Sequence, residues 1–336
     1  MKYEEVQELK ERVLKKAGEF GFGLDAVAKR VRISVGVGYP DDPDKRDTFK
    51  VAVRIRSWSP INLAFRLKLK LIFGAEADVR LTGPVRPLNC PGVTPRQTRF
   101  GIGASVSNPK DRNAGTLGFF ARRIRDGALG IVSNNHVIAR EDLGREGEVI
   151  LHPSHCDGGR AQDPSHVIAR LDESYPKLHV RPQEPKVVDC AFAVLDPRVV
   201  AAIDDEILSS LGNGRRLSST PGSLERARTV FKVGRTSNST TGRLVAGEFK
   251  PVEIDDYARG SVDFIDPIEI ESTTRAAFSD EGDSGALVCD QDNRPLGLLF
   301  ARAGAGGSNG GGLHYMAPIQ EVLSGLGVRI AVTKEP

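Results

Sequence analysis

The chain has 336 residues and an ordinary composition: 39% are hydrophobic, 6% are aromatic, and the formal net charge at pH 7 is +3. So small a charge argues against nucleic-acid binding, and no basic patch with aromatic stacking platforms is found. No run of about eighteen apolar residues occurs, so we expect no membrane span. The length suggests about two domains, and the 36 glycines and 20 prolines suit many short strands joined by tight turns.

Residues 1–88 are predicted to form a small α+β domain. Residues 4–16 carry apolar side chains on one helical face, and residues 24–29 favour a second short helix. Strands are predicted at residues 31–37, 49–55 and 77–81, with a turn-rich segment after the first. Three roles stay open for this domain: regulating access to a site, binding a partner, or completing the core.

Residues 62–73 fit two kinds of element. Phe65, Leu67, Leu69 and Leu71 alternate with basic residues, which favours a strand. Ser59-Pro60 before the segment and Gly74 after it would equally suit the start and the end of a helix. Residues 84–99 contain four prolines, and we assign residues 89–99 as a linker.

The first of three informative segments spans residues 130–139 and reads Gly-Ile-Val-Ser-Asn-Asn-His-Val-Ile-Ala. An apolar, strand-like stretch ends in small polar residues, and His136 follows them. The second segment, residues 187–195, sets Asp189 inside an otherwise apolar strand pattern. A charge in such a place costs several kcal/mol unless it is paired or hydrogen-bonded. Taken singly, His136 also fits a surface or core histidine, and Asp189 an edge-strand acid paired with an arginine.

The third segment, residues 282–288, reads Gly-Asp-Ser-Gly-Ala-Leu-Val. It presents Ser284 on a tight turn where the amides of Gly282 and Ser284 can point at one spot, as a developing oxyanion requires. Glycine, aspartate and serine are also the commonest turn residues, so the tetrapeptide Gly-Asp-Ser-Gly at residues 282–285 is by itself equally compatible with a surface turn. The chain order His136, Asp189, Ser284 differs from the subtilisin and α/β-hydrolase orders of the catalytic triad.

These segments resemble the trypsin- and chymotrypsin-like serine peptidases. Ser-Asn-Asn-His-Val at residues 133–137 is most similar to intracellular bacterial and plant members, and it overlaps the Asn-Asn-His-Val of the HtrA (Deg) peptidases. Residues 232–237 resemble the opening strand of the second barrel, and residues 315–323 the last strand and closing helix. The likeness covers roughly residues 100–330. No PDZ-sized segment follows, so we expect the HtrA domain arrangement not to be reproduced.

The resemblance implies a mostly β, two-barrel peptidase domain at residues 100–332, behind the α+β domain. It implies that His136 is the general base and that Asp189 orients it. Ser284 would then be the nucleophile, and Gly282 and Ser284 would donate to the oxyanion. The substrate would be a protein or peptide, and neither a metal nor a cofactor is expected.

Specificity is predicted from the positions that line the pocket in this family. Phe278 stands where an acid would select Arg or Lys, which argues against a trypsin-like preference. Phe300 and Arg302 would form another wall, and Arg302 would favour acidic or small residues if it points inward. The glycine-rich residues 304–312 follow, either as a hairpin loop or as a mobile rim.

Activation and cellular location follow from departures from the family. Secreted members pair the equivalent of Asp283 with a new N-terminus; here we favour an internal partner over cleavage after Arg99. The four cysteines, Cys90, Cys156, Cys190 and Cys289, do not match the family's disulfide positions, and no apolar signal core follows Met1. We therefore expect few or no disulfides and a cytoplasmic location.

The sequence leaves three further alternatives open. His152, His155 and Cys156 could be metal ligands, but one cluster without a second pair is weak, and we interpret residues 151–163 as a surface loop. The chain could also be a catalytically silent relative that serves as a protein-binding module. A regulated peptidase that cuts one specific partner, with an activating partner on the N-terminal domain, is equally permitted.

Overall fold

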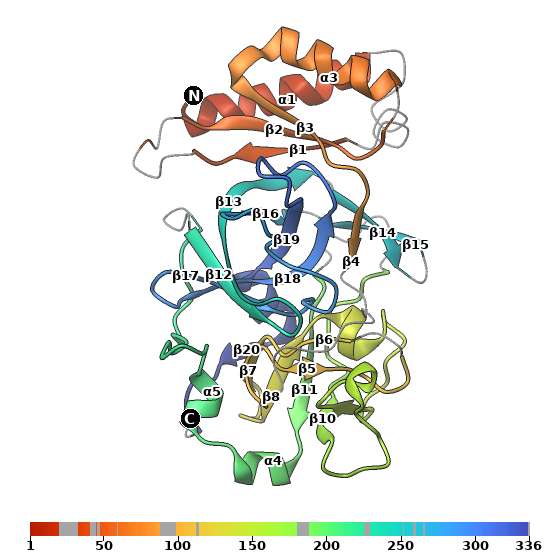
Figure 1. Cartoon of the computed structure of the whole chain (residues 1–336), viewed down its shortest axis with the longest axis vertical. Coiled ribbons are helices and arrows are strands. Elements are labelled where there is room, and N and C mark those ends of the chain that lie inside the picture. Colours follow the sequence, from red (N-terminus) through yellow and green to blue (C-terminus); the bar gives the residue numbers. More distant parts are fainter. Residues whose placement is uncertain are drawn as a thin grey trace.

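The structure is a computed structural model. It describes residues 1–19, 33–40, 45, 48–58, 60–87, 99–111, 114–179, 188–224, 229–250, 252–257, 260–264 and 266–334. The chain is mostly β and is arranged in three tiers along its longest axis, with the N-terminal unit at the top of Figure 1. The helix predicted at residues 24–29 and most of the predicted linker lie outside the described residues. None of the described helices is both long and apolar enough to cross a membrane.

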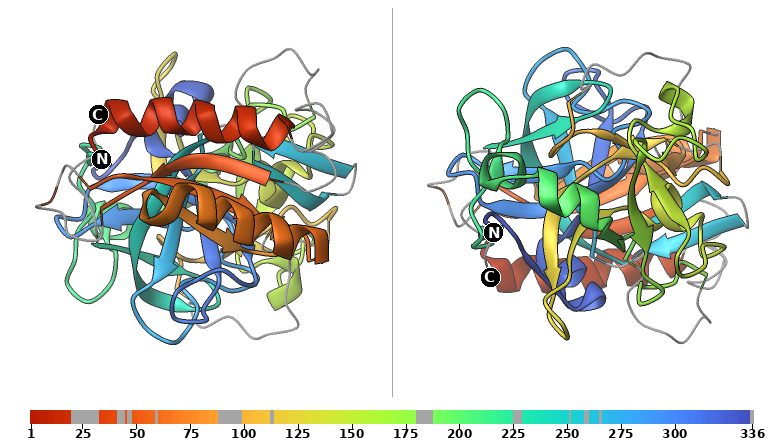
Figure 2. Two further views of the ribbon diagram at one scale, coloured as in Figure 1. Left: turned by 90° about the horizontal axis from the view of Figure 1, so that it is seen from above. Right: turned by 90° about the horizontal axis from the view of Figure 1, so that it is seen from below.

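The N-terminal unit packs two helices on a small sheet. Its elements are α1 (Tyr3–Glu19), β1 (Ile33–Gly38), β2 (Lys50–Ile55), α3 (Pro60–Phe73) and β3 (Ala77–Leu81). Strands β2 and β3 are parallel, so they need a long crossover, which α3 supplies. Seen from above in Figure 2, α1 and α3 lie over these strands. The predicted first helix and all three predicted strands are confirmed to within a few residues.

The ambiguous segment at residues 62–73 is helix α3. Phe65, Leu69 and Phe73 recur every four residues and are buried in the core of the unit. Leu67 and Leu71 lie on another face and are 61% and 86% exposed. The apparent period of two arose because this helix carries apolar residues on both a buried and an exposed face.

One β-barrel closes completely. Strands β12 (Thr229–Gly234), β17 (Leu287–Asp290), β18 (Pro295–Ala303), β19 (Leu313–Pro318), β16 (Ile268–Ser272) and β13 (Asn238–Lys250) pair in this order, and β12 pairs back to β13. Strand β1 pairs with the far end of β13, so the N-terminal unit extends the sheet of the barrel across the predicted boundary. A hairpin, β14 (Val252–Tyr257) and β15 (Gly260–Phe264), lies between β13 and β16 in the sequence.

The other tier is a six-stranded sheet that stays open. Its order is β20 (Val328–Ile330), β7 (Phe119–Arg123), β8 (Leu129–Ser133), β11 (Ala191–Leu195), β10 (Val167–Leu171) and β9 (Val149–Leu151). The expectation of two closed barrels is therefore wrong for the described residues. The sheet is not closed at its β9 edge because only short segments lie there. These are β5 (Ser105–Val106) and β6 (Gly115–Thr116), each two residues long, and a single bridge joins Ser107 to Leu151 of β9.

Short helices complete the two tiers. Helices α4 (Pro197–Ala202) and α5 (Asp205–Ser209) follow β11, and α6 (Ile319–Leu326) returns the chain from the barrel to β20 in the open sheet. Three-residue helical turns lie at Gly74–Glu76 and His155–Asp157, and a single π-helical turn lies at Asn135–Ala139. The largest apolar core runs through both tiers, so they fold against one another.

Strand β4 (Val85–Pro87) lies just before the predicted linker, in the proline-rich residues 84–99, where no strand was predicted. It pairs antiparallel with β18 of the barrel. Backbone pairing of this kind needs no sequence pattern in a three-residue segment, which is why the strand was not predicted.

The described cysteines are compatible with the prediction. Cys190 and Cys289 are free and fully buried, as expected of small core residues. Cys156 is in a disulfide bond, which is compatible with the expectation of few or no disulfides. The cellular location stays a prediction.

Candidate active site

Strand register brings His136 to Asp189. Strands β8 and β11 are antiparallel neighbours with Ser133 opposite Ala191, so the residues just beyond these strand ends meet. His136 Nδ1 lies 2.5 Å from Asp189 Oδ2, and the backbone N–H of His136 donates to Asp189 Oδ1 at 3.2 Å. Asn134 Nδ2 donates to the Asp189 carbonyl at 2.5 Å. This histidine and this carboxylate therefore form a directed pair.

A third donor reaches the same carboxylate from another tier. Tyr257 Oη, on β14, donates to Asp189 Oδ2 at 2.9 Å. Burial and the Asp189 charge raise the pKa of Tyr257 well above its usual value, so the phenol keeps its proton. The buried Asp189 thus accepts bonds that compensate its desolvation, as the sequence analysis required.

Ser284 is presented on the turn between β16 and β17. Gly282 and Gly285, on either side, both have φ of +90°, a conformation that side chains rarely adopt. A Cβ on Gly285 would lie 2.3 Å from Ser133 Oγ and 2.4 Å from the Thr116 carbonyl oxygen. The turn therefore approaches the segment that carries His136 so closely that only glycine fits.

Thr116 joins the serine turn to the histidine strand. Its N–H donates to the Ser284 carbonyl at 2.7 Å, and its Oγ1 donates to the Gly282 carbonyl at 2.9 Å. Its own carbonyl accepts from Ser133 Oγ at 2.8 Å. Thr116, on β6, thus ties the turn carrying Ser284 to the end of β8, three residues before His136.

Asp283 has an internal partner. Its Oδ2 lies 3.2 Å from Lys232 Nζ, both side chains are fully buried, and its Oδ1 accepts the N–H of Thr236 at 2.8 Å. Burial alone would raise the pKa of Asp283, but the Lys232 charge, the Ser237 hydroxyl and backbone donors hold it below its usual range. The expectation of an internal partner is confirmed, and the serine turn is held without a new N-terminus.

The segment at residues 151–163 is exposed at many positions, as predicted for a surface loop, but it also makes a buried contact beside the serine turn. Asp157 forms an ion pair with Arg235, and both side chains are almost fully buried. His152 Nδ1 bonds to the Ser105 carbonyl at 2.9 Å, while His155 is exposed. Of these contacts, the Asp157–Arg235 pair joins this loop to the closed barrel.

The three residues of the candidate triad are all fully buried. His136, Asp189 and Ser284 each have 0% exposure. Ser284 Oγ donates to the Phe300 carbonyl of β18 at 3.3 Å. The Ser284 hydroxyl is therefore closed to solvent in this structure.

The predicted specificity residues do not share one environment. Phe278 is buried in the core of the closed barrel, against His314, whose burial lowers its pKa to about 3. Phe300 belongs to the larger core and packs on Phe264 at 4.6 Å between ring centroids. Arg302 is at the surface, where its Nη1 donates to Asp280 at 2.9 Å.

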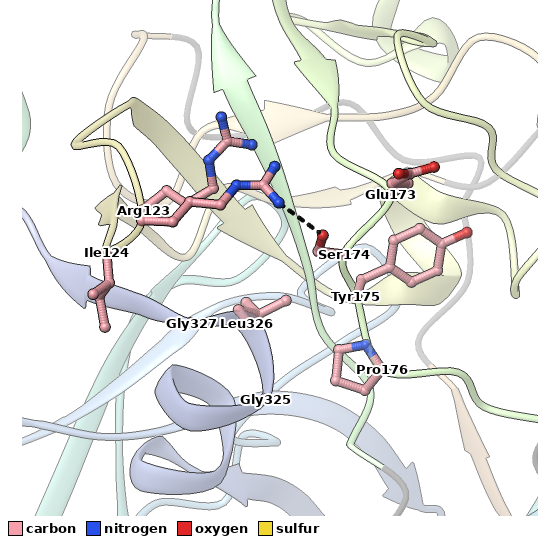
Figure 3. A pocket seen from close by; sticks show the side chains of 10 residues that line it. Arg123, Ile124, Glu173, Ser174, Tyr175, Pro176, Gly325, Leu326 and Gly327 are labelled. Atoms are coloured by element: carbon pink, nitrogen blue, oxygen red, sulfur yellow. Dashed lines mark hydrogen bonds between the residues drawn. The ribbon is translucent and has the colours of Figure 1, made fainter.

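Two cavities lie outside the candidate triad. The larger, about 610 Å³, is lined by residues of the β7–β8 turn, the segment around Tyr175 and the end of α6 (Figure 3). No triad residue lines it, so it is not the site of the proposed chemistry. A cavity of about 380 Å³ lies between Trp58, Arg86, Glu281 and Arg302, where the N-terminal unit meets the serine turn.

Of the comparisons with known proteins, only the one with solved structures finds matches. No family model matches the chain, and no curated protein matches it. Among solved structures, Protease A of Thermobifida fusca has 17% identity over 69% of this chain and 98% of its own, with a TM-score of 0.44. A glutamic acid-specific serine protease has 17% identity over 68% and 99%, at 0.45. The chymotrypsin of Cellulomonas bogoriensis has 18% over 70% and 99%, at 0.43.

These solved structures are similar to the chain in architecture at low identity. Because their TM-scores are below 0.5, the roles of individual residues are argued from the geometry alone. The resemblance to the HtrA branch is tested by none of them and stays a prediction.

The sequence analysis did not find several residues of this site. Thr116 and Tyr257 occur in no recognisable spacing, and Arg235 lies in the quoted residues 232–237 without a role assigned to it. Each acts across segments that are distant in the sequence. Asn134 and Ser133 lay within the quoted motif, but only the structure assigns their hydrogen bonds.

Proposed function

We propose that the protein is a serine endopeptidase that hydrolyses peptide bonds through His136, Asp189 and Ser284. The observation that carries the proposal is the 2.5 Å pairing of His136 Nδ1 with the buried Asp189, beside a glycine-flanked turn that presents Ser284. That arrangement provides a nucleophile, a base and a group that orients the base.

The reaction follows from these roles. Ser284 Oγ attacks the peptide carbonyl while His136 Nε2 takes the hydroxyl proton, and a C–O bond forms. The tetrahedral intermediate collapses, the C–N bond breaks, and His136 returns the proton to the leaving amine. Water then attacks the acyl-enzyme by the same route and releases the acid.

The oxyanion formed at each step requires donors beside Ser284. The amides of Gly282 and Ser284 are the proposed pair, in keeping with the positive φ of Gly282. Loss of one such donor typically costs about 100- to 1000-fold in rate. The ties from Thr116 and Asp283 support this role because they hold the turn on both sides.

A second candidate is a peptidase-like binding module without activity. The full burial of Ser284 and His136 favours it, because neither side chain is accessible in this structure. An activating partner on the N-terminal unit would reconcile burial with catalysis, and that partner remains a proposal.

Labelling with a fluorophosphonate probe tests the proposal, because the probe bonds covalently to activated serines. We expect wild type to be labelled, and Ser284→Ala and His136→Ala to abolish labelling and casein hydrolysis, with rates falling at least about 10⁴-fold. Labelling that persists in Ser284→Ala would place the nucleophile elsewhere. If variants that open the site are not labelled either, the binding module is favoured.

A further inference from the structure

The buried Tyr257 hydroxyl completes the surroundings of Asp189. It donates to the oxygen that faces His136 Nδ1, while the other oxygen accepts the His136 backbone N–H. Three donors from two tiers therefore fix the plane of one carboxylate. A carboxylate held in this way can keep the imidazole of His136 in one orientation and one tautomer.

The hairpin that carries Tyr257 is itself anchored at the site. The Tyr257 ring meets the His136 ring edge-on with centroids 6.0 Å apart and stacks on Phe264 at 6.1 Å. Phe264 in turn packs on Phe300, whose carbonyl accepts from Ser284. The hairpin therefore links the base, its carboxylate and the strand beside the nucleophile.

We propose that Tyr257 is a positioning residue that acts on His136 through Asp189. This inference rests on the function proposed above. The hydroxyl supplies no proton to the reaction; it limits rotation of the Asp189 carboxylate, so that His136 Nε2 stays directed at its target.

Tyr257→Phe tests the role because it removes one oxygen and keeps the ring packing. We expect kcat to fall about tenfold with KM nearly unchanged, since a hydrogen bond to a charged group is lost. The low-field NMR resonance of the His136 Nδ1 proton should move as well. Tyr315→Phe is the matched control, because it removes a tyrosine bond of 3.2 Å from a different buried carboxylate, Glu269.

An unchanged kcat and an unmoved resonance in Tyr257→Phe would overturn the role of Tyr257. If kcat falls equally in Tyr315→Phe, the effect of Tyr257→Phe would be explained by general destabilisation. If wild type lacks all activity, the proposed function fails, whereas the resonance still reports whether Tyr257 acts on the Asp189–His136 pair.

A second inference comes from β4, which occupies the edge of β18 next to Ser284. Along this edge β17 pairs up to Leu298, and Leu299 then exchanges hydrogen bonds with Gly285 and Ala286 of the serine turn. From Ala301 onward the edge is taken by β4, with Pro87 opposite Ala301. The opposite edge of β18 is filled by β19.

The polarity of β4 leads the chain toward the nucleophile. Val85 is opposite Ala303 and Pro87 is opposite Ala301, so β4 advances toward Phe300, where Ser284 Oγ is bound. An extended peptide that paired antiparallel with this edge would run in the same direction and bring a carbonyl to Ser284. Such addition of a strand to a sheet edge is a common way of binding peptides.

Strand β4 is held in place from the N-terminal unit. Thr82, three residues before Val85, donates its N–H to the Ile55 carbonyl of β2 at 2.9 Å. Val85 is fully buried, and β14 lies against β4 on the side of the hairpin. Arg56 of the N-terminal unit also donates to the Glu253 carbonyl of β14.

We propose that β4 is a resident occupant of the strand-binding edge of β18, and that a peptide substrate reaches Ser284 only when β4 leaves it. This too rests on the proposed function and names the regulation of the same site. Because β4 is tethered, its effective concentration at the edge is high, and a free peptide competes poorly. Ser284 is fully buried in this structure, in which β4 occupies the edge.

A reversible lock tests this inference. Val85 and Ala303 are directly opposed, so the double variant Val85→Cys/Ala303→Cys should form a disulfide across the two strands. We expect the oxidised protein to hydrolyse peptides at least about tenfold more slowly than the reduced form. Val85→Cys alone, given the same reductant, controls for reduction of native disulfides, and mass spectrometry confirms the lock.

A complementary variant opens the edge. Val85→Asp introduces a charge where the side chain is buried, so we expect faster fluorophosphonate labelling and faster amide exchange at residues 301–303. Glu146→Gln, on an exposed side chain of the open-sheet tier, should change neither. Hydrolysis by the locked protein at the unlocked rate would overturn the occupancy model while leaving the peptidase intact. Inactivity of both the reduced and the Val85→Asp proteins would overturn the proposed function together with this inference.

Discussion

Gly285 sets the approach of the serine turn to the open sheet. Its φ of +90° and the two oxygens that would lie within 2.4 Å of an added Cβ leave no room for a side chain. The nearest atoms belong to Ser133 and Thr116, which cannot retreat without breaking their own hydrogen bond of 2.8 Å. The distance between the nucleophile and the base therefore depends on this one glycine.

Gly285→Ala should destabilise the protein by roughly 2–4 kcal/mol and reduce labelling of Ser284 by about 100-fold or more, because the turn must shift. Gly127→Ala is the matched control: its φ is +74°, but no atom lies within 4 Å of the added carbon. It should cost about 1 kcal/mol and leave labelling unchanged. Equal effects of the two substitutions in urea unfolding and labelling would show that backbone strain alone, and not the close approach, matters.

Individual site residues could be predicted from the sequence where their immediate neighbours in the chain are unusual. His136, Asp189 and Ser284 could be named because a histidine after a strand, an acid in an apolar strand and a serine between glycines are unusual locally. Thr116 and Tyr257 could not be named, because a threonine or tyrosine gains its role only from the strand that lies opposite it.

Strand β16 joins the barrel to the N-terminal unit through Glu271. Its carboxylate pairs with Arg80 of β3 at 2.9 Å and with Arg243 of β13, and it accepts the N–H of Ser308 at 3.1 Å. Burial alone would raise the pKa of Glu271, but the Ser308 donors and the Arg243 charge lower it from 4.5 to about 2. Three elements and the glycine-rich loop thus depend on one ionised carboxylate.

The depressed pKa of Glu271 makes stability depend on acid pH. The unfolded chain takes up the proton near pH 4.5 and the folded chain near pH 2, so the stabilisation is complete above pH 4.5 and is lost as the pH falls toward 2. The loss should approach roughly 3 kcal/mol. Glu271→Gln should flatten this part of the pH profile of urea unfolding, whereas Glu146→Gln, at an exposed position, should not. Identical slopes in all three proteins would contradict this role.

At the scale of elements, prediction succeeded where apolar residues recur with a regular period. Helix α1 carries an apolar face, and β1, β2 and β3 place apolar residues at every second position, although β1 and β2 are buried along nearly their whole length. Helix α3 remained ambiguous because its exposed leucines mimic a strand, and β4 was missed because three residues contain no period at all.

A buried ion pair holds the N-terminal unit to the barrel. Arg54 of β2 donates to Glu269 of β16 at 2.6–3.0 Å, and the two side chains are 1% and 0% exposed. Tyr315 donates to the same carboxylate. Together with the pairing of β1 with β13, this contact makes the unit part of one continuous sheet.

Arg54→Met should destabilise the protein by about 3–5 kcal/mol, since Glu269 would remain buried without its counter-charge. Adding Glu269→Gln should recover part of that loss, which a double-mutant cycle would measure. Strict additivity of the two substitutions would contradict coupling across the interface.

The same contact predicts that the chain unfolds as one unit. Trp58 is the single tryptophan and lies in the N-terminal unit, so its fluorescence reports that part, while far-UV circular dichroism reports the whole. Coincident urea transitions are expected in wild type, and separate ones in Arg54→Met.

By itself the sequence determined the local chemistry of this protein: the three residues of the candidate triad, the α+β pattern of the N-terminal region and the abundance of short strands. These follow from residue type and spacing within about ten positions. Only the tertiary structure decided that one barrel closes, that Lys232 neutralises Asp283, that Tyr257 supports Asp189 and that β4 fills the edge beside Ser284. Each of those contacts joins segments far apart in the chain, where strand register and burial, and not local pattern, select the partner.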